Sequence, residues 1–143
     1  MFSTDASILD DYSPARERML EYAKLFEELH VVVYNRKVSA RGGSLPTGQA
    51  GSKGGKGEKL KVKGSGTLTI YSTNTKFRPL YFWQAYKIGS SIIGNLELGI
   101  RNFVITTQDP FETGLVGVWL KNKFKIPLQV QCHVDFLNKY FWQ

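Results

Sequence analysis

The sequence predicts an α/β fold, a Rossmann-like open parallel sheet with helices on both faces, formed by one domain of 143 residues. Short runs rich in β-branched residues alternate along the chain with longer segments of helical periodicity. Several of these runs lack polar alternation, which is typical of parallel strands covered on both faces. Right-handed crossovers between such strands build a sheet of this kind. The predicted strands are Met1–Thr4, Leu29–Tyr34, Thr67–Tyr71, Phe103–Thr106 and Leu128–Cys132.

The first predicted strand is either cut a few residues into its length or a stub, and the helix after it has a clear start. Residues 1 to 4 are too few for a full strand. Ser13 suits the cap of the following helix, and Pro14 suits its first position. Arg16 and Arg18 fall in the first turn, where cations oppose the helix dipole. Arginines at a helix N-terminus predict an anion site, and the alternative is that they are solvated and merely tolerated.

The chain changes character between residues 36 and 66. This segment holds most of the glycines and almost no large apolar residue, which predicts a flexible basic insertion. Eight of the 19 basic residues but one of the 12 acidic residues lie between Arg36 and Lys63. The net charge of +7 therefore belongs to the insertion, and the rest of the chain is neutral. A solvated loop is favoured over nonspecific contact with RNA or an anionic membrane, so a nucleic-acid function is disfavoured.

Two phosphate-binding motifs are absent from the sequence. The Walker pattern requires glycine, four residues, and then Gly-Lys followed by Ser or Thr. Around Gly55-Lys56 the first position is Ala50 and the last is Gly57, so the pattern fails. The dinucleotide fingerprint G-x-G-x-x-G is missing after the first strand, which argues against a dehydrogenase.

An aromatic helix follows the third predicted strand. Residues 72 to 76 form a polar turn that contains Asn74, and Pro79 opens the helix. The aromatic stripe favours core or interdomain packing; it comprises Leu80, Tyr81, Phe82, Trp83, Tyr86 and Ile88. The alternative is contact with a phosphorylated lipid or a membrane surface, because basic and aromatic residues lie next to one another at the start of the helix. The residues that suit such a contact are Lys76, Phe77, Arg78 and Tyr81.

The fourth strand leads into a helix through Gln108, Asp109 and Pro110. Asp109 can accept from the first free N–H groups, Pro110 suits the first helical position, and Glu112 can reach back. The last strand follows this helix, and Cys132 at its end is expected to pack as a small buried residue. The helix residues expected to face inward are Leu115, Val116, Val118 and Trp119.

Polar residues that follow the predicted strands form the candidate site. Ligands bind beyond the carboxyl ends of parallel strands, where the topology changes direction. Residues at this edge can therefore act together although they are far apart in sequence. They are Asp5, Asn74, Gln108, Asp109, His133 and Asp135.

Two segments resemble the N-terminal domain of family 4 (group 1) glycosyltransferases, which are retaining enzymes of the GT-B type. They are QDPFETGLVG at residues 108–117 and PLQVQCHVDF at residues 127–136. In that family an (H/Q)(D/E)P segment opens the helix after the fourth strand, and a histidine ends the following strand. ARERMLEYAK at residues 15–24 and IYSTN at residues 70–74 extend the resemblance over most of the chain outside the insertion.

The resemblance implies the N-terminal half of a GT-B fold and a retaining hexosyltransferase-type activity. A sugar would pass from a nucleotide-sugar donor to a glycan or lipid-linked acceptor, without a cofactor or a metal. The N-terminal domain would hold mainly the acceptor. His133 matches the family's histidine near the transferred sugar and, with Asp109, is a catalytic candidate. The substrate-binding candidates are Arg16, Arg18, Asp5, Asn74, Gln108, Glu112 and Asp135.

The sequence departs from the family because it stops at Gln143, before a donor-binding domain with an E-x7-E motif. The chain alone is therefore expected to be inactive, and the alternative function is a non-catalytic Rossmann-like module whose basic insertion contacts RNA or anionic membrane. A single cysteine, no secretory signal and no apolar run near ~20 residues predict a cytoplasmic protein. A lipid-linked acceptor would place it at the inner face of the cell membrane.

Overall fold

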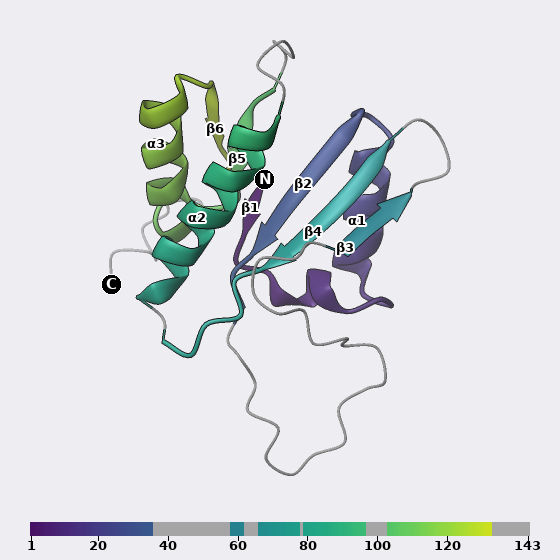
Figure 1. The fold of residues 1–143 in the computed structure, drawn as a ribbon. Coiled ribbons are helices and arrows are strands. Elements are labelled where there is room, and N and C mark those ends of the chain that lie inside the picture. The colour runs from purple at the N-terminus through teal and green to yellow at the C-terminus, as the bar shows by residue number, and fades with distance from the viewer. Residues whose placement is uncertain (36–57, 62–65, 78, 97–102, 133–143) are drawn as a thin grey trace, which may run out of the picture.

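The computed structural model describes residues 1–35, 58–61, 66–77, 79–96 and 103–132, which form a three-layer α/β arrangement (Figure 1). A six-stranded sheet with the strand order β3-β4-β2-β1-β5-β6 is the central layer. The elements in chain order are β1 (Phe2–Ser3), the 3-10 helix η1 (Ala6–Leu9), α1 (Pro14–Ala23), β2 (Glu28–Val33), β3 (Glu58–Lys61), β4 (Thr67–Ser72), α2 (Leu80–Asn95), β5 (Ile105–Thr107), α3 (Glu112–Phe124) and β6 (Leu128–Val130).

The sheet confirms the predicted Rossmann-like fold. Five strands are parallel, and their order β4-β2-β1-β5-β6 is that of a doubly wound sheet. The chain moves outward from β1 through β2 to β4, crosses back through α2, and continues on the other side through β5 and β6. The switch point therefore lies between β1 and β5. The first strand has two residues.

Strand β3 corrects the prediction that residues 36–66 form a loop throughout. Glu58 to Lys61 pair antiparallel with β4, with Glu58 opposite Ile70 and Lys61 opposite Thr67. Without this pairing β4 would be an edge strand with a row of unpaired N–H and C=O groups. The high glycine content of the insertion concealed these four residues from sequence reasoning. The rest of the predicted insertion, residues 36–57 and 62–65, lies outside the described residues.

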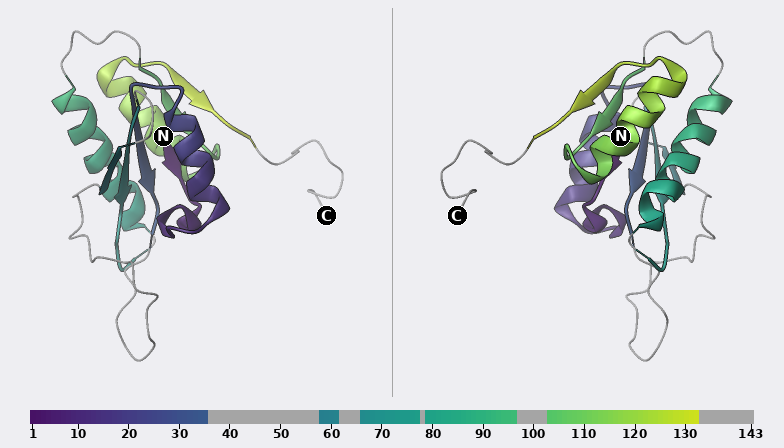
Figure 2. Two further views of the ribbon diagram at one scale, coloured as in Figure 1. Left: turned by 90° about the vertical axis from the view of Figure 1, so that its right-hand side faces the viewer. Right: turned by 90° about the vertical axis from the view of Figure 1, so that its left-hand side faces the viewer.

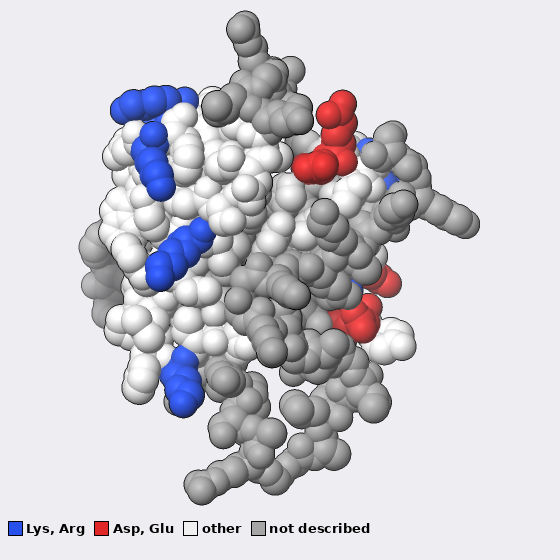
Figure 3. All heavy atoms as spheres, viewed as in Figure 1, with Lys and Arg blue, Asp and Glu red and all other residues white. Residues whose placement is uncertain are grey.

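Helices cover both faces of the sheet. Helix α1 and η1 lie on one face, and α2 and α3 lie side by side on the other (Figures 1 and 2). Lysine side chains line the side of the molecule formed by α2 and α3, whereas the acidic side chains in the same view lie toward β2 and α1 (Figure 3). In the part of the chain that the structure describes, no helix has both the length and the hydropathy that a membrane span requires.

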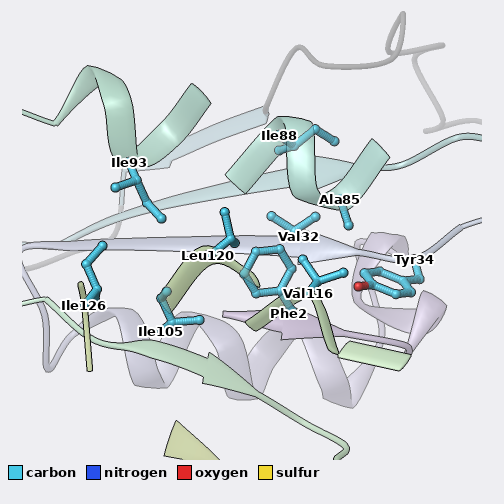
Figure 4. Packing of buried hydrophobic residues seen from close by; sticks show 10 residues of the cluster. All are labelled: Phe2, Val32, Tyr34, Ala85, Ile88, Ile93, Ile105, Val116, Leu120 and Ile126. Carbon is cyan, nitrogen blue, oxygen red and sulfur yellow. The ribbon is translucent and has the colours of Figure 1, made fainter. Parts of the chain in front are cut away.

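Strand β2 is covered on both of its faces, as its sequence predicts. Val32 points toward α2 and α3, where it packs with Phe2, Ile88 and Leu120 (Figure 4). Val31 belongs to the second core, which β2 and β4 form with α1 and η1. The remaining buried residues of this second core are Ile8, Ala15, Met19, Ala23, Val33, Leu68 and Ile70. Alternation within one strand thus supplies both cores.

Helix α3 is rotated relative to the prediction. Leu115, Val118 and Trp119 were expected to face inward, but each is 41–42% exposed; Val116 is buried as expected. The helix approaches the sheet through glycine instead. A Cβ on Gly117 would lie 2.8 Å from side-chain carbons of both Leu128 and Thr107. The larger apolar residues therefore lie on the outer side; the buried face is Thr113, Gly114, Val116, Gly117 and Leu120.

The prediction for Cys132 was also wrong. Its side chain is exposed. Strand β6 is the outermost strand on its side of the sheet, and the neighbouring Gln129 and Val130 are exposed as well. Among the described residues no further strand pairs with the outer side of β6.

Candidate functional site

The candidate site lies at the carboxyl edge of the sheet, where β1 and β5 are neighbours. The two strands pair in parallel, with Phe2 opposite Thr107. From this edge the chain leaves β1 toward η1 and α1 on one face, and leaves β5 toward α3 on the other. Parallel α/β sheets bind ligands at an edge where the connections diverge in this way.

Ser3 and Gln108 join the two strand ends. The hydroxyl of Ser3, which is fully buried, donates to the side-chain oxygen of Gln108 and accepts from the backbone N–H of Asp5 at 3.0 Å. The backbone N–H of Gln108 donates to the carbonyl oxygen of Phe2 at 3.1 Å. The predicted binding residue Gln108 is therefore held at the switch point through both its backbone and its side chain.

Asp109 organises the start of α3. Its carboxylate accepts from the N–H of Phe111 at 2.9 Å, from the N–H of Thr113 at 3.2 Å, and from the Thr113 hydroxyl at 2.9 Å. This confirms that Asp109 accepts from the first free N–H groups. The predicted helix start was wrong, because Pro110 and Phe111 form a turn and the helix begins at Glu112. The bond from Asp109 to the N–H two residues later is the geometry of an Asx turn.

Tyr34, which sequence reasoning missed, lies beneath this edge. It directly follows β2, is 5% exposed, and donates its hydroxyl to the carbonyl oxygen of Glu112 at 3.4 Å. Burial, together with the carboxylates of Asp109 and Glu112, raises the pKa of Tyr34 far above its ordinary value. The phenol therefore stays a hydrogen-bond donor. A hydroxyl-bearing aromatic at the carboxyl end of a central strand is the signal that could have identified it.

Asn74 lies at the same edge but away from the switch point. It follows β4, and β2 lies between β4 and β1, so Asn74 is about 10 Å from the switch point by ordinary strand spacing. Its φ is 44°, a left-handed conformation that asparagine adopts more readily than most residues. The preceding residue, Thr73, is buried, and its hydroxyl accepts from the N–H of Asn35 at 2.9 Å. The turn that contains Asn74 is therefore fixed to the end of β2 by the hydrogen bond between Thr73 and Asn35.

The candidates near α1 have structural partners. Ser13 caps the helix as predicted, accepting from the N–H of Arg16 at 3.1 Å. The Arg16 side chain is buried, donates to the carbonyl oxygen of Ile8 at 3.5 Å, and lies 2.9 Å from a carboxylate oxygen of Asp11. Arg16 thus joins η1 to the loop before α1.

Arg18 and Asp5, the other two candidates near α1, differ in their surroundings. Arg18 is exposed to solvent on α1. Asp5 is also exposed, and its carboxylate accepts from the N–H of Ser7 at 3.0 Å and caps η1. Asp5 is therefore tied to its own turn, whereas the guanidinium of Arg18 lies at the surface.

Glu112 is half-buried at the first position of α3, close enough to Tyr34 for its carboxylate to affect that phenol. His133 and Asp135 lie outside the described residues, which reach Cys132. Within the described ranges there is no group of three or more His, Cys, Asp or Glu side chains suited to a metal ion.

Comparisons of the chain with protein-family models, with curated proteins and with solved structures found no match.

Proposed function

We propose that this chain is the acceptor-side domain of a retaining GT-B glycosyltransferase. The proposal is carried by the position of the Gln108-Asp109-Pro110 segment, which occupies the switch point of a doubly wound sheet. The motif that resembles the glycosyltransferase family therefore lies at the edge where doubly wound sheets in general bind ligands. Ser3 and Tyr34, which come from neighbouring strand ends, support the same edge.

Sugar transfer requires a bound acceptor whose hydroxyl is oriented toward the sugar donor, with water excluded. In the proposed reaction the acceptor oxygen forms a bond to the anomeric carbon, the bond to the nucleotide diphosphate breaks, and the acceptor proton leaves with the diphosphate. Gln108 and Glu112 supply polar groups that can orient acceptor hydroxyls. His133 would hydrogen-bond the transferred sugar, and a second Rossmann-like domain would hold the donor.

The experiment is a transfer assay with the complete coding region that contains this chain. Purified protein is incubated with radiolabelled nucleotide sugars and with a glycolipid or glycan extract, and incorporation is measured. We expect transfer that His133→Ala reduces by about 100-fold or more, as is typical when a group acting on the transition state is removed. Failure of the complete protein to transfer any of the sugars would refute the proposed function.

A matched histidine control separates loss of chemistry from loss of folding. His30 lies in β2, where its ring contacts the Tyr71 hydroxyl at 3.3 Å and Glu28 at 3.2 Å. We expect His30→Ala to lower thermal stability and to leave transfer per folded molecule unchanged. Turnover that is unchanged in His133→Ala would refute the assignment of His133 while leaving the enzyme class standing.

A further inference from the structure

The outer surface of α2 and α3 carries large apolar side chains at solvent-facing positions, where polar side chains are usual. We call this surface the α2–α3 face and define it by Trp83, Tyr86, Leu115, Val118 and Trp119. Trp83 is 55% exposed, and Leu115, Val118 and Trp119 are 41–42% exposed. A helix that covers a sheet usually presents polar residues outward. A contiguous exposed apolar surface marks a site of interaction.

The aromatic rings of the α2–α3 face form a row that crosses from one helix to the other. Trp83 and Tyr86 stack with their ring centroids 6.0 Å apart, and Tyr86 meets Trp119 edge to face at 6.1 Å. The three rings therefore form one continuous row across both helices. Beside it lies an apolar hollow of about 490 Å³, whose lining includes Phe82 and Phe111.

Two lysines lie over the rings of this row. The ammonium group of Lys87 lies 5.3 Å from the Trp83 ring centroid, and that of Lys123 lies 5.4 Å from the Tyr86 centroid. Lys121 belongs to the last turn of α3. The two helices contain one acidic residue, Glu112, which is half-buried. Figure 3 shows lysines along this side of the molecule and no acidic side chain among them.

We propose that the α2–α3 face binds the surface of a membrane that contains anionic lipid. Tryptophan and tyrosine rings favour the boundary between headgroups and acyl chains, and lysine stems lie along such apolar surfaces while their ammonium groups reach lipid phosphates. The lysines of this face are different residues from the lysines and arginines of the predicted insertion. The inference rests on this surface alone, so it is independent of the proposed enzymatic function.

The charge pattern favours a membrane over a second copy of the chain. In a two-fold dimer the same patch meets itself, so the lysines of one copy would approach those of the other. Like charges brought together at an interface are repelled, whereas phosphates of anionic lipids attract them. The placement of Lys87 and Lys123 over the aromatic rings thus opposes self-association and suits a negatively charged bilayer.

The decisive measurement is quenching of tryptophan fluorescence by lipids brominated on their acyl chains. The chain contains three tryptophans, two of which belong to the α2–α3 face, so the experiment uses a Trp142→Phe background. In that background Trp83→Phe and Trp119→Phe each leave one reporter. We expect both reporters to be quenched by brominated phosphatidylcholine vesicles that contain phosphatidylglycerol. The same vesicles without bromine should quench neither reporter.

Charge variants test the role of the lysines in the same assay. Replacing both Lys87 and Lys123 by glutamine should weaken the vesicle affinity by roughly 25-fold, since each lysine near a membrane surface contributes about five-fold. Lys24→Gln is the matched control, because Lys24 is an exposed lysine at the end of α1, paired with Glu21. We expect Lys24→Gln to change the affinity by less than about two-fold. Thermal melts verify that the variants are folded.

Three results would overturn the proposal. Vesicle binding without quenching of either reporter would assign the contact to another surface, such as the basic insertion. Quenching that is equally strong without phosphatidylglycerol would refute the requirement for anionic lipid. A dimer that shields Trp83 and Trp119 from an aqueous quencher, with no vesicle binding, would assign the face to a second copy of the chain.

Discussion

The cap that Asp109 provides for α3 yields a prediction that separates structure from chemistry. Asp109→Ala removes three acceptor contacts, to the N–H groups of Phe111 and Thr113 and to the Thr113 hydroxyl. Loss of a helix cap by truncation to alanine costs about 0.5–2 kcal/mol. We place this variant in the upper half of that range, at about 1.5 kcal/mol, because a half-buried side-chain contact is lost as well. The melting temperature should fall by roughly 5 °C.

Asp109→Asn is the matched variant. Its amide oxygen can still accept from the N–H groups of Phe111 and Thr113, so most of the cap survives. The lost negative charge near the start of α3 should cost about 0.5 kcal/mol. Urea unfolding of both variants, with Asp10→Ala as a control in an exposed turn, measures these values. Equal destabilisation by alanine and asparagine, or none by alanine, would refute the capping argument.

The same pair of variants tests the catalytic assignment of Asp109 in the complete enzyme. If the carboxylate contacts the acceptor, Asp109→Asn should retain its stability and lose most of its transfer activity. If Asp109 acts through the cap alone, activity should follow stability, so that asparagine is close to wild type and alanine is weaker. The two roles thus predict different orders for the same three proteins.

Two further predictions concern packing and pH. Gly117→Val should destabilise the fold by about 1–3 kcal/mol, because the new side chain meets Leu128 and Thr107; Gly94→Ala, with open space around its Cβ, should instead be neutral or stabilising in the same thermal melts. Because the pKa of the Tyr34 phenol is raised in the folded state, its contribution is fully present below the unfolded pKa of about 10 and is lost as the pH rises above it. In denaturant titrations above about pH 10, the free energy of unfolding of the wild type should therefore fall relative to that of Tyr34→Phe by about 1.4 kcal/mol per pH unit. Parallel pH profiles for the two proteins would contradict this.

Features that depend on neighbours in sequence were predictable. Ser13 and Pro14 start α1 as expected, since a cap bonds to an N–H three residues away. The order of strands and helices, and with it the fold class, was also predictable, because hydrophobic periodicity is a local signal. The polar residues at the ends of β1 and β5 then had to meet at one edge, since parallel strands share their carboxyl edge.

Features that depend on distant residues were missed. The orientation of α3 follows from how closely Gly117 can approach Leu128 and Thr107, which belong to two other elements. The environment of Tyr34 is set first by burial and then by the carboxylates of Asp109 and Glu112, about 75 residues later in the chain. Arg16 was weighed as an anion ligand from its place in the helix, but its partners are Ile8 in η1 and Asp11 in the loop before α1. Side-chain partners of this kind are not encoded in periodicity.

The brevity of β1 has a consequence for how the domain opens and refolds. β1 is two residues long and stands in the middle of the sheet, joined to β5 through the single residue pair of Phe2 and Thr107. In contrast, β2 and β4 pair over six residues. The β5–β6 half is thus attached by the hydrogen bonds between the ends of β1 and β5 and by the core that α2 and α3 share with Phe2. Amide hydrogens at this seam should exchange before those of β2 and β4, and the two halves should open as separate cooperative units.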